Sequence, residues 1–327
     1  MGCEPPTHTL TMPTDILVTA PLPDFLYDPL KRDYRCHDYH AASDKTALLA
    51  GEGARIRGLV QGGGTLAPTS LLDQLRNLEI ISVFGVGYDG VPVDYCRMRG
   101  LKVTNTPDVL TDDVADVAVG LVLMTGRGFV RLERFARAGE WKKRGPELTT
   151  KLSGRTAGIL GLGRIGKAIA QRLSAMGMKI AYTGRKPQAG VPYRFVPDLT
   201  TLASESDFLI VACPGGPATQ NLVDGNVLAA LGKDGTIVNI ARGSIIDEPA
   251  LVQALQAGTI KAAGLDVFVD EPNIPAGLMT MDNVVLLPHV GSATRETRQA
   301  MGDLCKANLD AWFPAKKTLT LIPELAA

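Results

Sequence analysis

The sequence has few aromatic residues, no excess charge of either sign and no long apolar run. Aromatic residues make up 5% of the 327 residues, and 34 Lys and Arg residues balance 34 Asp and Glu residues. A net charge of zero gives no electrostatic basis for binding nucleic acid or an anionic membrane. The longest apolar run, residues 114–124, is interrupted by Asp116 and is too short to span a bilayer. We therefore expect neither a nucleic-acid nor a membrane partner.

Cysteine is scarce, which argues against a disulfide-rich secreted protein. The five cysteines are odd in number and far apart, a spacing that fits neither a disulfide framework nor a zinc site. His37 and His40 form an H-x-x-H pair without a cysteine pattern or an acidic helix motif, so we interpret them as surface residues and expect no metal. The first fourteen residues contain no apolar core and are interpreted as a loose tail, not a secretory signal. These features predict a reducing, cytoplasmic location.

Glycine, in contrast, is abundant. The 35 glycines and the 45% of hydrophobic residues suit an α/β protein with many tight turns between strands and helices. Short apolar segments alternate with amphipathic ones, which predicts βαβ units and parallel sheets. Helices are predicted at residues 70–78, 93–99, 111–125 and 292–312, the last ended by Pro314. Strands are predicted at residues 16–20, 56–60, 80–84 and 102–104 in a first series, and at residues 156–160, 179–183, 208–213, 236–240, 263–267 and 284–287 in a second.

Each series of strands is large enough for its own sheet. We therefore predict the α/β fold class, with two doubly wound parallel-sheet domains. The substrate-binding domain is expected to comprise residues 1–105 and 294–327, because the last helix follows the second series and can return to the first domain. Residues 106–293 are expected to form a dinucleotide-binding domain. Short joints of this kind act as hinges, and the cleft between the domains is the expected ligand site.

The strongest local signal is a glycine fingerprint that follows the apolar segment at residues 156–160. Gly161 permits a tight turn, Gly163 allows the backbone to approach a pyrophosphate, and Gly166 lets the next helix pack closely on the strand. A Gly-x-Gly-x-x-Gly pattern alone is weak, but this one has a strand before it and a helix and another strand after it. The pattern predicts a bound dinucleotide.

The end of the next strand indicates which dinucleotide is used. A carboxylate about 20 residues after the fingerprint commonly binds the adenosine ribose of NAD. This sequence has Gly184, Arg185 and Lys186 there instead. A 2′-phosphate is held by such cations and repelled by a carboxylate. We therefore predict NADPH as the cofactor, with NADH less favoured; the alternative is a pair of solvated surface charges.

Polar side chains follow the last three predicted strands. Arg242 comes after the first of them, Glu271 after the second and His289 after the third. The carboxyl ends of parallel strands share one edge of a sheet, where ligands of such sheets bind. These three side chains can therefore converge near a bound nicotinamide.

With these motifs the sequence resembles the D-isomer-specific 2-hydroxyacid dehydrogenase family, from about residue 16 to residue 313. The matching motifs are GLGRIG at residues 161–166, NIARGS at 239–244, GLDVFVDEP at 264–272 and PHVGSAT at 288–294. The segments FGVGYD at 84–89 and VTNTPDVLT at 103–111 resemble the glyoxylate/hydroxypyruvate reductase branch. Thr183, Gly184 and Arg185 match its NADPH-using members. The resemblance implies a Rossmann cofactor domain inserted into a flavodoxin-like substrate domain.

The resemblance also implies a role for each catalytic residue. Arg242 binds the substrate carboxylate and polarises the keto group, His289 donates and accepts the proton, and Glu271 is the partner of His289. The backbone at Val86 and Gly87 holds the substrate carboxylate as well. The chemistry of these residue types agrees with those roles. Arginine makes bidentate contacts that can orient the keto carbon of a substrate. A carboxylate beside a histidine favours its charged imidazolium form.

The resemblance further implies a set of cofactor-binding residues around the fingerprint and the later strand ends. Pro214 and Ile240 line the nicotinamide ring, Thr111 lies near it, and Asp266 contacts the carboxamide side. The full predicted set comprises Thr111, Gly161, Leu162, Gly163, Arg164, Ile165, Gly166, Gly184, Arg185, Lys186, Pro214, Thr219, Ile240, Ala241, Asp266 and Gly291.

The predicted function is the NADPH-dependent reduction of hydroxypyruvate and glyoxylate to D-2-hydroxy acids. The enzymatic alternative is a reductase of bulkier aryl or branched 2-keto acids. Formate dehydrogenase relatives share the fold but have Gln as the partner of the catalytic His, so Glu271 argues against them. An alternative from another class is a dinucleotide-sensing corepressor, which needs no turnover; the intact Arg242, Glu271 and His289 favour the enzyme.

Two further segments carry predictions of their own. The resemblance implies that an arm at residues 119–141 forms a homodimer, with Trp141 near the partner's active site; alternatively, Trp141 is a core anchor. Gly62, Gly63 and Gly64 follow a strand of the first series and are interpreted as a permissive turn. The functional alternative is that these glycines, which lack side chains, leave space for the C3 substituent of the substrate.

Overall fold

The computed structural model describes residues 13–326 and divides into two compact units. Unit 1 comprises the chain up to Pro107 and from Arg298 onward, and unit 2 comprises Asp108–Thr297. The predicted joints are at 105/106 and 293/294, and the predicted N-terminal tail lies almost entirely outside the described residues. None of the helices between residues 13 and 326 has the length and apolarity that a bilayer crossing requires.

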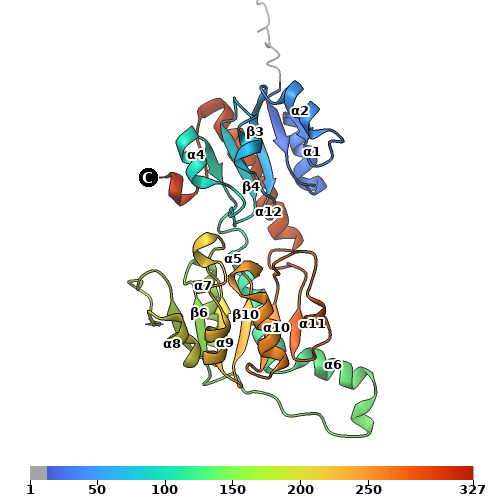
Figure 1. Cartoon of the computed structure of the whole chain (residues 1–327), viewed down its shortest axis with the longest axis vertical. Helices are drawn as coiled ribbons and strands as arrows, with labels where there is room; N and C mark the ends of the chain where they lie inside the picture. The colour runs from blue at the N-terminus through green and yellow to red at the C-terminus, as the bar shows by residue number, and fades with distance from the viewer. Residues whose placement is uncertain (1–12, 327) are drawn as a thin grey trace, which may run out of the picture. The chain divides into compact units, whose positions relative to one another are not determined.

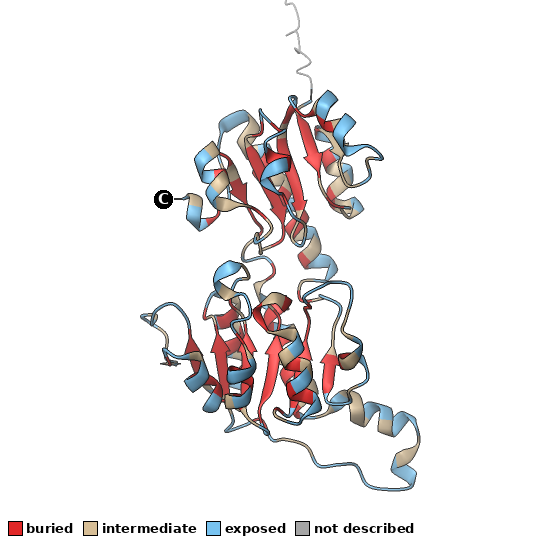
Figure 2. Ribbon diagram, in the orientation of Figure 1, coloured by how far each residue is buried: buried red, intermediate tan, exposed pale blue. Residues whose placement is uncertain are grey.

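Unit 1 contains a five-stranded parallel sheet in the order β2-β1-β3-β4-β5, which is the flavodoxin-like order (Figure 1). The inner strands β1 and β4 are buried along their whole length, as expected for a parallel sheet covered on both faces (Figure 2). The strands are β1 (Asp15–Val18), β2 (Arg35–Asp38), β3 (Ile56–Gly62), β4 (Ile80–Phe84) and β5 (Lys102–Thr104).

The helices of unit 1 include one that is much shorter than predicted. Residues 70–78 were expected to be helical, but the α-helix ends at Leu72 and the chain continues as i→i+3 turns that still bury Leu75 and Leu78. The last helix continues to Ala315, one residue beyond Pro314, so the prediction that Pro314 ends this helix is wrong by one residue. The helices are α1 (Asp24–Asp33), α2 (Lys45–Glu52), α3 (Thr69–Leu72), α4 (Val93–Arg99), η4 (Pro323–Leu325) and α12 (Arg295–Ala315), which begins in the last residues of unit 2.

Unit 2 contains a seven-stranded parallel sheet in the order β12-β11-β10-β9-β6-β7-β8. Counted from β6, the six strands other than β12 follow the Rossmann order 3-2-1-4-5-6. The prediction of two doubly wound α/β units is confirmed. The strands are β6 (Thr156–Leu160), β7 (Lys179–Thr183), β8 (Arg194–Phe195), β9 (Phe208–Val211), β10 (Thr236–Asn239), β11 (Ala262–Leu265) and β12 (Val284–Leu286).

Most helices of unit 2 pack on its sheet, but one does not. No residue of α6 is buried, and Figure 1 shows α6 projecting away from the rest of the unit. The first part of the predicted arm, residues 119–126, instead belongs to α5, which packs on α7 and β11. The helices are α5 (Thr111–Gly126), α6 (Phe129–Arg137), η1 (Glu140–Lys142), α7 (Arg164–Ala175), α8 (Leu199–Ser204), η2 (Pro217–Thr219), α9 (Gly225–Leu231), η3 (Gly243–Ile245), α10 (Glu248–Gln256) and α11 (Ala276–Met279).

Candidate active site

His289 and Glu271 form a hydrogen-bonded ion pair in unit 2. The Nδ1 atom of His289 lies 2.7 Å from Oε2 of Glu271, and Oε1 of Glu271 accepts the Phe268 amide at 3.0 Å. Burial by itself would raise the pKa of Glu271, but the bonds from His289 and Phe268 and the charges of His289 and Arg242 together lower it. The carboxylate therefore stays ionised, and the Nε2 edge of His289 remains for another partner.

The loop that carries His289 is held by a buried carboxylate. Asp266, which is 1% exposed, follows β11, and its two oxygens accept the amides of Val290 and Gly291, each at 2.8 Å. The Asp266 carbonyl also accepts the His289 amide at 2.9 Å. His289 has a φ of 53°, in the left-handed region, so these three bonds fix a backbone that histidine rarely adopts. Asp266 therefore positions His289, and its contact with the nicotinamide stays a prediction.

The loop that carries Arg242 is held by a second buried polar side chain. Asn239 is 1% exposed; its Oδ1 accepts the Ala241 amide at 3.0 Å, and its Nδ2 donates to the Arg242 carbonyl at 2.9 Å. A Cβ at Gly243 would overlap the Phe268 backbone, so the loop after β10 packs directly on the loop after β11. The structure thus brings Arg242 and Glu271 together. The sequence marks Asn239 only as part of the NIARGS motif, and its place at the end of a buried strand is the signal for a positioning role.

The three fingerprint glycines meet different surroundings. A Cβ at Gly161, where φ is 97°, would lie 2.7 Å from the Cys213 backbone, and one at Gly166 would overlap the Gly161 carbonyl. Apart from the neighbours of Gly163 in sequence, no atom of residues 13–326 lies within 4 Å of a Cβ built on this glycine, at the N-terminus of α7. Two glycines are thus required by the packing of the chain itself. The third leaves an open space over a helix N-terminus, which fits a pyrophosphate.

The cationic loop after β7 lies beside this fingerprint. Arg185 and Lys186 are exposed and form no ion pair within residues 13–326, and Gly184 has open space at its Cβ position. Gln188 holds the loop in place, because its Nε2 donates to the Leu162 carbonyl at 2.7 Å and its amide donates to the Tyr182 hydroxyl at 2.8 Å. No sequence pattern marks Gln188, since an isolated Gln in a loop has no characteristic pattern.

The other predicted cofactor residues lie on the same edge of unit 2. Gly291 is buried beside Asp266, and a Cβ there would lie 3.1 Å from an Asp266 oxygen. The Thr219 hydroxyl donates to the Pro214 carbonyl at 2.8 Å, which shapes the loop after β9. Thr111 begins α5, Ile240 and Ala241 follow β10, and Leu162, Arg164 and Ile165 lie in the glycine loop and the first turn of α7. Their roles toward a cofactor remain predictions.

Val86 and Gly87 lie in unit 1, directly after β4. The Nδ2 atom of Asn105 donates to the Val86 carbonyl at 2.8 Å, and the Thr106 amide donates to the Gly85 carbonyl at 3.0 Å. Asn105 is 7% exposed, so this bond is shielded from water. The loop predicted to hold the substrate carboxylate therefore has a fixed backbone within its own unit.

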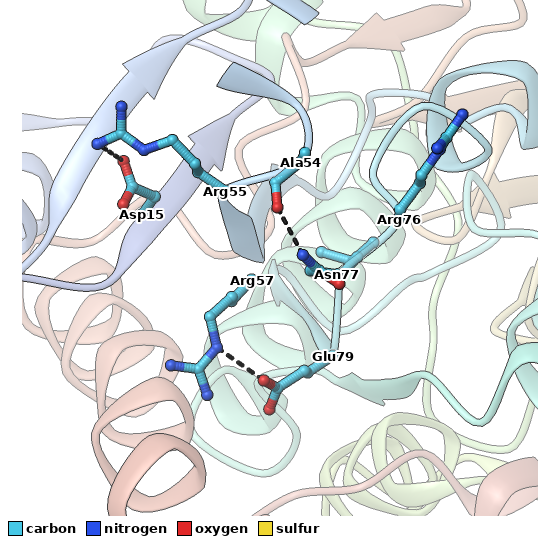
Figure 3. Close-up of a pocket in the computed structure, with 8 residues that line it drawn as sticks. Asp15, Ala54, Arg55, Arg57, Arg76, Asn77 and Glu79 are labelled. Atoms are coloured by element: carbon cyan, nitrogen blue, oxygen red, sulfur yellow. Dashed lines mark hydrogen bonds and ion pairs between the residues drawn. The ribbon is translucent and has the colours of Figure 1, made fainter. Parts of the chain in front are cut away.

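A depression of about 630 Å³ in unit 1 lies at the opposite end of the strands, the amino end. Figure 3 shows its guanidinium groups pointing apart, with Arg55 facing Asp15 and Arg57 facing Glu79. Each of the two carboxylates that line the depression is already paired with an arginine, so we do not assign the active site here.

His37 lies close to this depression. Its Nε2 is 2.7 Å from Asp15 Oδ1 and its side chain is 12% exposed, so His37 is more buried than the predicted surface residue. His37, Asp15 and Glu52 have ligand atoms within 4.8 Å of one another. Arg35 and Arg55 also lie within 3.7 Å and 3.5 Å of Asp15. These two cations oppose the binding of a metal ion.

Comparison with known proteins defines the class to which this fold and site belong. The family model of the D-isomer specific 2-hydroxyacid dehydrogenase NAD binding domain matches residues 119–291. Glyoxylate/hydroxypyruvate reductase A of Arabidopsis thaliana and hydroxyphenylpyruvate reductase of Plectranthus scutellarioides are each 44% identical over 305 residues, 93% of this chain and 97% of theirs. The 2-ketogluconate reductase of Gluconobacter oxydans is 44% identical over 306 residues, 94% of this chain and 97% of its own.

Solved structures of similar proteins lead to the same classification. The NADPH-dependent glyoxylate/hydroxypyruvate reductase of Sinorhizobium meliloti, in complex with NADP and malonate, matches with a TM-score of 0.88 and 42% identity over 96% of this chain and 98% of that one. The chain belongs to the D-isomer-specific 2-hydroxyacid dehydrogenase family. Within this family it is an NAD(P)-dependent dehydrogenase of the glyoxylate/hydroxypyruvate reductase branch.

The lowered pKa of Glu271 predicts a pH-dependent contribution to stability. Because the folded state favours the ionised form, Glu271 stabilises the fold above the pKa of about 4.3 of an unfolded glutamate, and this contribution is lost as the pH falls. The Tm difference between wild type and Glu271→Gln should therefore be larger at neutral pH than at about pH 3.5. Glu296→Gln, at an exposed site on α12, is the control. A Tm difference independent of pH would contradict the ion pair.

Proposed function

We propose that this chain reduces small 2-keto acids, hydroxypyruvate and glyoxylate foremost, to D-2-hydroxy acids and that it prefers NADPH. The observation that carries the proposal is the His289–Glu271 pair, 2.7 Å apart, with Arg242 close enough for its charge to act on Glu271. A proton donor, its anionic partner and a carboxylate-binding cation are the groups that the reduction of a 2-keto acid requires. A corepressor would need none of them.

The proposal gives each side chain a role. Arg242 binds the substrate carboxylate and polarises the keto oxygen through its planar fork of donors. Nδ1 of His289 is held by Glu271, so Nε2 is the atom that gives its proton to the keto oxygen as it becomes a hydroxyl. The glycine loop of unit 2 would hold NADPH, which would supply the hydride for C2. Glu271 stabilises the imidazolium of His289 before the proton is transferred. Backbone amides at Val86 and Gly87 are proposed as a second set of hydrogen-bond donors to the substrate carboxylate.

The residues of unit 2 fit the cofactor. The open space over Gly163 at the N-terminus of α7 accepts a pyrophosphate, and the exposed Arg185 and Lys186 suit a 2′-phosphate. The structure with NADP, at 42% identity, supports this choice. The hydroxyphenylpyruvate reductase, at 44% identity, supports aryl 2-keto acids as the second candidate class of substrate.

We also propose that the chain works as a homodimer in a reducing cytoplasm. The exposed side chains of Phe129, Trp141 and Leu148, which are 45%, 72% and 94% accessible, line a segment that makes no core in unit 2. Large apolar side chains left exposed on a projecting segment are candidates for a protein interface. The free thiols at residues 36, 96, 213 and 305 are consistent with a reducing compartment.

The proton-donor assignment predicts a large loss of turnover on replacement of His289. His289→Asn should lower kcat by about 10²–10⁴-fold, because general acid catalysis is lost. Asn is the cleanest choice, since it tolerates the left-handed backbone at this position, where φ is 53°. NADPH binding, followed by fluorescence, should persist. Turnover close to that of the wild type would exclude His289 as the donor.

The proposed preference for NADPH predicts a difference in kcat/KM between the two cofactors. Charge-assisted hydrogen bonds from Arg185 are worth about 1.5–3 kcal/mol, which corresponds to a preference for NADPH of about one to two decades in kcat/KM. The preference should shrink at high salt, because Arg185 is exposed. Gly184→Asp with Arg185→Ala should move the preference toward NADH. Equal or better use of NADH by the unmodified chain would leave Arg185 and Lys186 as surface charges only.

A further inference from the structure

The cationic loop after β7, residues 184–188, is attached to the glycine loop of unit 2 at both of its ends. Directly before the cationic loop, the carbonyl of Thr183 accepts the Gly161 amide at 3.0 Å. At its other end, Nε2 of Gln188 donates to the Leu162 carbonyl at 2.7 Å. The two attachment points are thus adjacent residues of the glycine loop.

A buried tyrosine holds the same end of the cationic loop. The backbone amide of Gln188 donates to the Tyr182 hydroxyl at 2.8 Å. Tyr182 is 1% exposed, and its ring packs against that of Phe195 with the ring centres 5.4 Å apart. Close packing keeps this acceptor in place. The backbone and the side chain of Gln188 are therefore both fixed, each by a partner outside the cationic loop.

The residues between the two attachment points have no support of their own. Gly184, Arg185, Lys186 and Pro187 are exposed, and no hydrogen bond or ion pair joins them to another residue between 13 and 326. Pro187 has a fixed φ and restricts the backbone of Lys186, so the segment next to Gln188 is short and stiff. The place of the two cations therefore depends on the place of Gln188.

The glycine loop itself does not depend on Gln188. A Cβ on Gly161 would lie 2.7 Å from the Cys213 backbone, so this glycine is packed against the end of β9. A Cβ on Gly166 would lie 2.1 Å from the Gly161 carbonyl oxygen, so the first turn of α7 is packed against the glycine loop as well. Loss of the Gln188 side chain would therefore release the cationic loop and leave the glycine loop in place.

We propose that Gln188 is a positioning residue for the selection of the cofactor's 2′-phosphate, because it holds Arg185 and Lys186 beside the glycine loop. This role rests on the preference for NADPH proposed above. A charge-assisted hydrogen bond contributes most when its donor is already in place, since no ordering cost is subtracted from it. A free loop would carry the same two charges and lose part of the selectivity. The carboxamide of Gln188 supplies the attachment without adding a charge beside the phosphate.

The test isolates the 2′-phosphate with two nucleotides. Adenosine 2′,5′-bisphosphate and adenosine 5′-monophosphate differ only in that group, so the ratio of their Kd values reports its contribution. Titration calorimetry at constant ionic strength compares wild type, Gln188→Met, Tyr182→Phe and the control Gln171→Met, at an exposed glutamine on α7.

Methionine keeps the length of the glutamine side chain but has no N–H donor. Gln188→Met should raise the Kd of the bisphosphate about three- to tenfold, the equivalent of one hydrogen bond, and that of the monophosphate by less than about twofold. Tyr182→Phe, which removes only the acceptor of the Gln188 amide, should raise the Kd of the bisphosphate about two- to threefold. Gln171→Met should match the wild type.

A second background separates positioning from a general loss of structure. In a chain that carries Arg185→Ala and Lys186→Ala, Gln188→Met should leave the ratio of the two Kd values unchanged, because no cation remains to be positioned. An equal effect of Gln188→Met on both nucleotides would overturn the role of Gln188. The same change in the ratio with and without the two cations would overturn it as well.

The wild type separates this inference from the proposed function. If it prefers the bisphosphate and Gln188→Met leaves the ratio unchanged, only the role of Gln188 is refuted. If it binds both nucleotides equally, the preference for NADPH is refuted and the role of Gln188 with it. Reduction of keto acids is measured separately as turnover by the wild type.

Discussion

The buried carboxylate of Asp266 is the interaction on which the candidate site depends. Burial raises its pKa, whereas the amides of Val290 and Gly291 and the charge of His289 favour its ionised form. A carboxylate shielded from water is tolerated only when hydrogen bonds replace its hydration, and here each oxygen has a backbone donor at 2.8 Å. The same two bonds fix the loop after β12. His289 thus faces Glu271 in a backbone conformation that it would otherwise leave.

The same principle organises the loop after β10. Asn239 ends its strand with the side chain buried, so its donor and its acceptor must both find partners. They find them in the loop that presents Arg242. In both loops a buried polar side chain at the strand end determines the place of a candidate catalytic side chain, His289 in one loop and Arg242 in the other. Charges held in this way need no reordering when a ligand binds, which is the pre-organisation that the proposed reaction would use.

The sequence predicts the inner strands well, because a strand buried on both faces is a short apolar run bounded by glycine or polar residues. It does not predict β2, whose residues Arg35–Asp38 are polar and only half-buried at the sheet edge. Residues 70–78 have apolar side chains spaced as in a helix, but i→i+3 turns bury the same leucines. Motifs point to Arg242, Glu271 and His289 as candidates, and their roles stay predictions. Asn105 and Gln188 act through tertiary contacts with distant residues, so no local pattern marks them.

The groups proposed to perform the chemistry and the group proposed to select the cofactor are held in different ways. Glu271, Arg242 and His289 lie in loops fixed by bonds to buried or backbone partners, whereas Arg185 is exposed. A change that breaks one of these bonds alters a loop together with a candidate catalytic side chain, whereas a change at Arg185 leaves the loops of Arg242 and His289 intact. Relatives named for hydroxypyruvate, hydroxyphenylpyruvate and 2-ketogluconate are each 44% identical to this chain, as expected where one scaffold carries different specificities in side chains on which the fold does not depend.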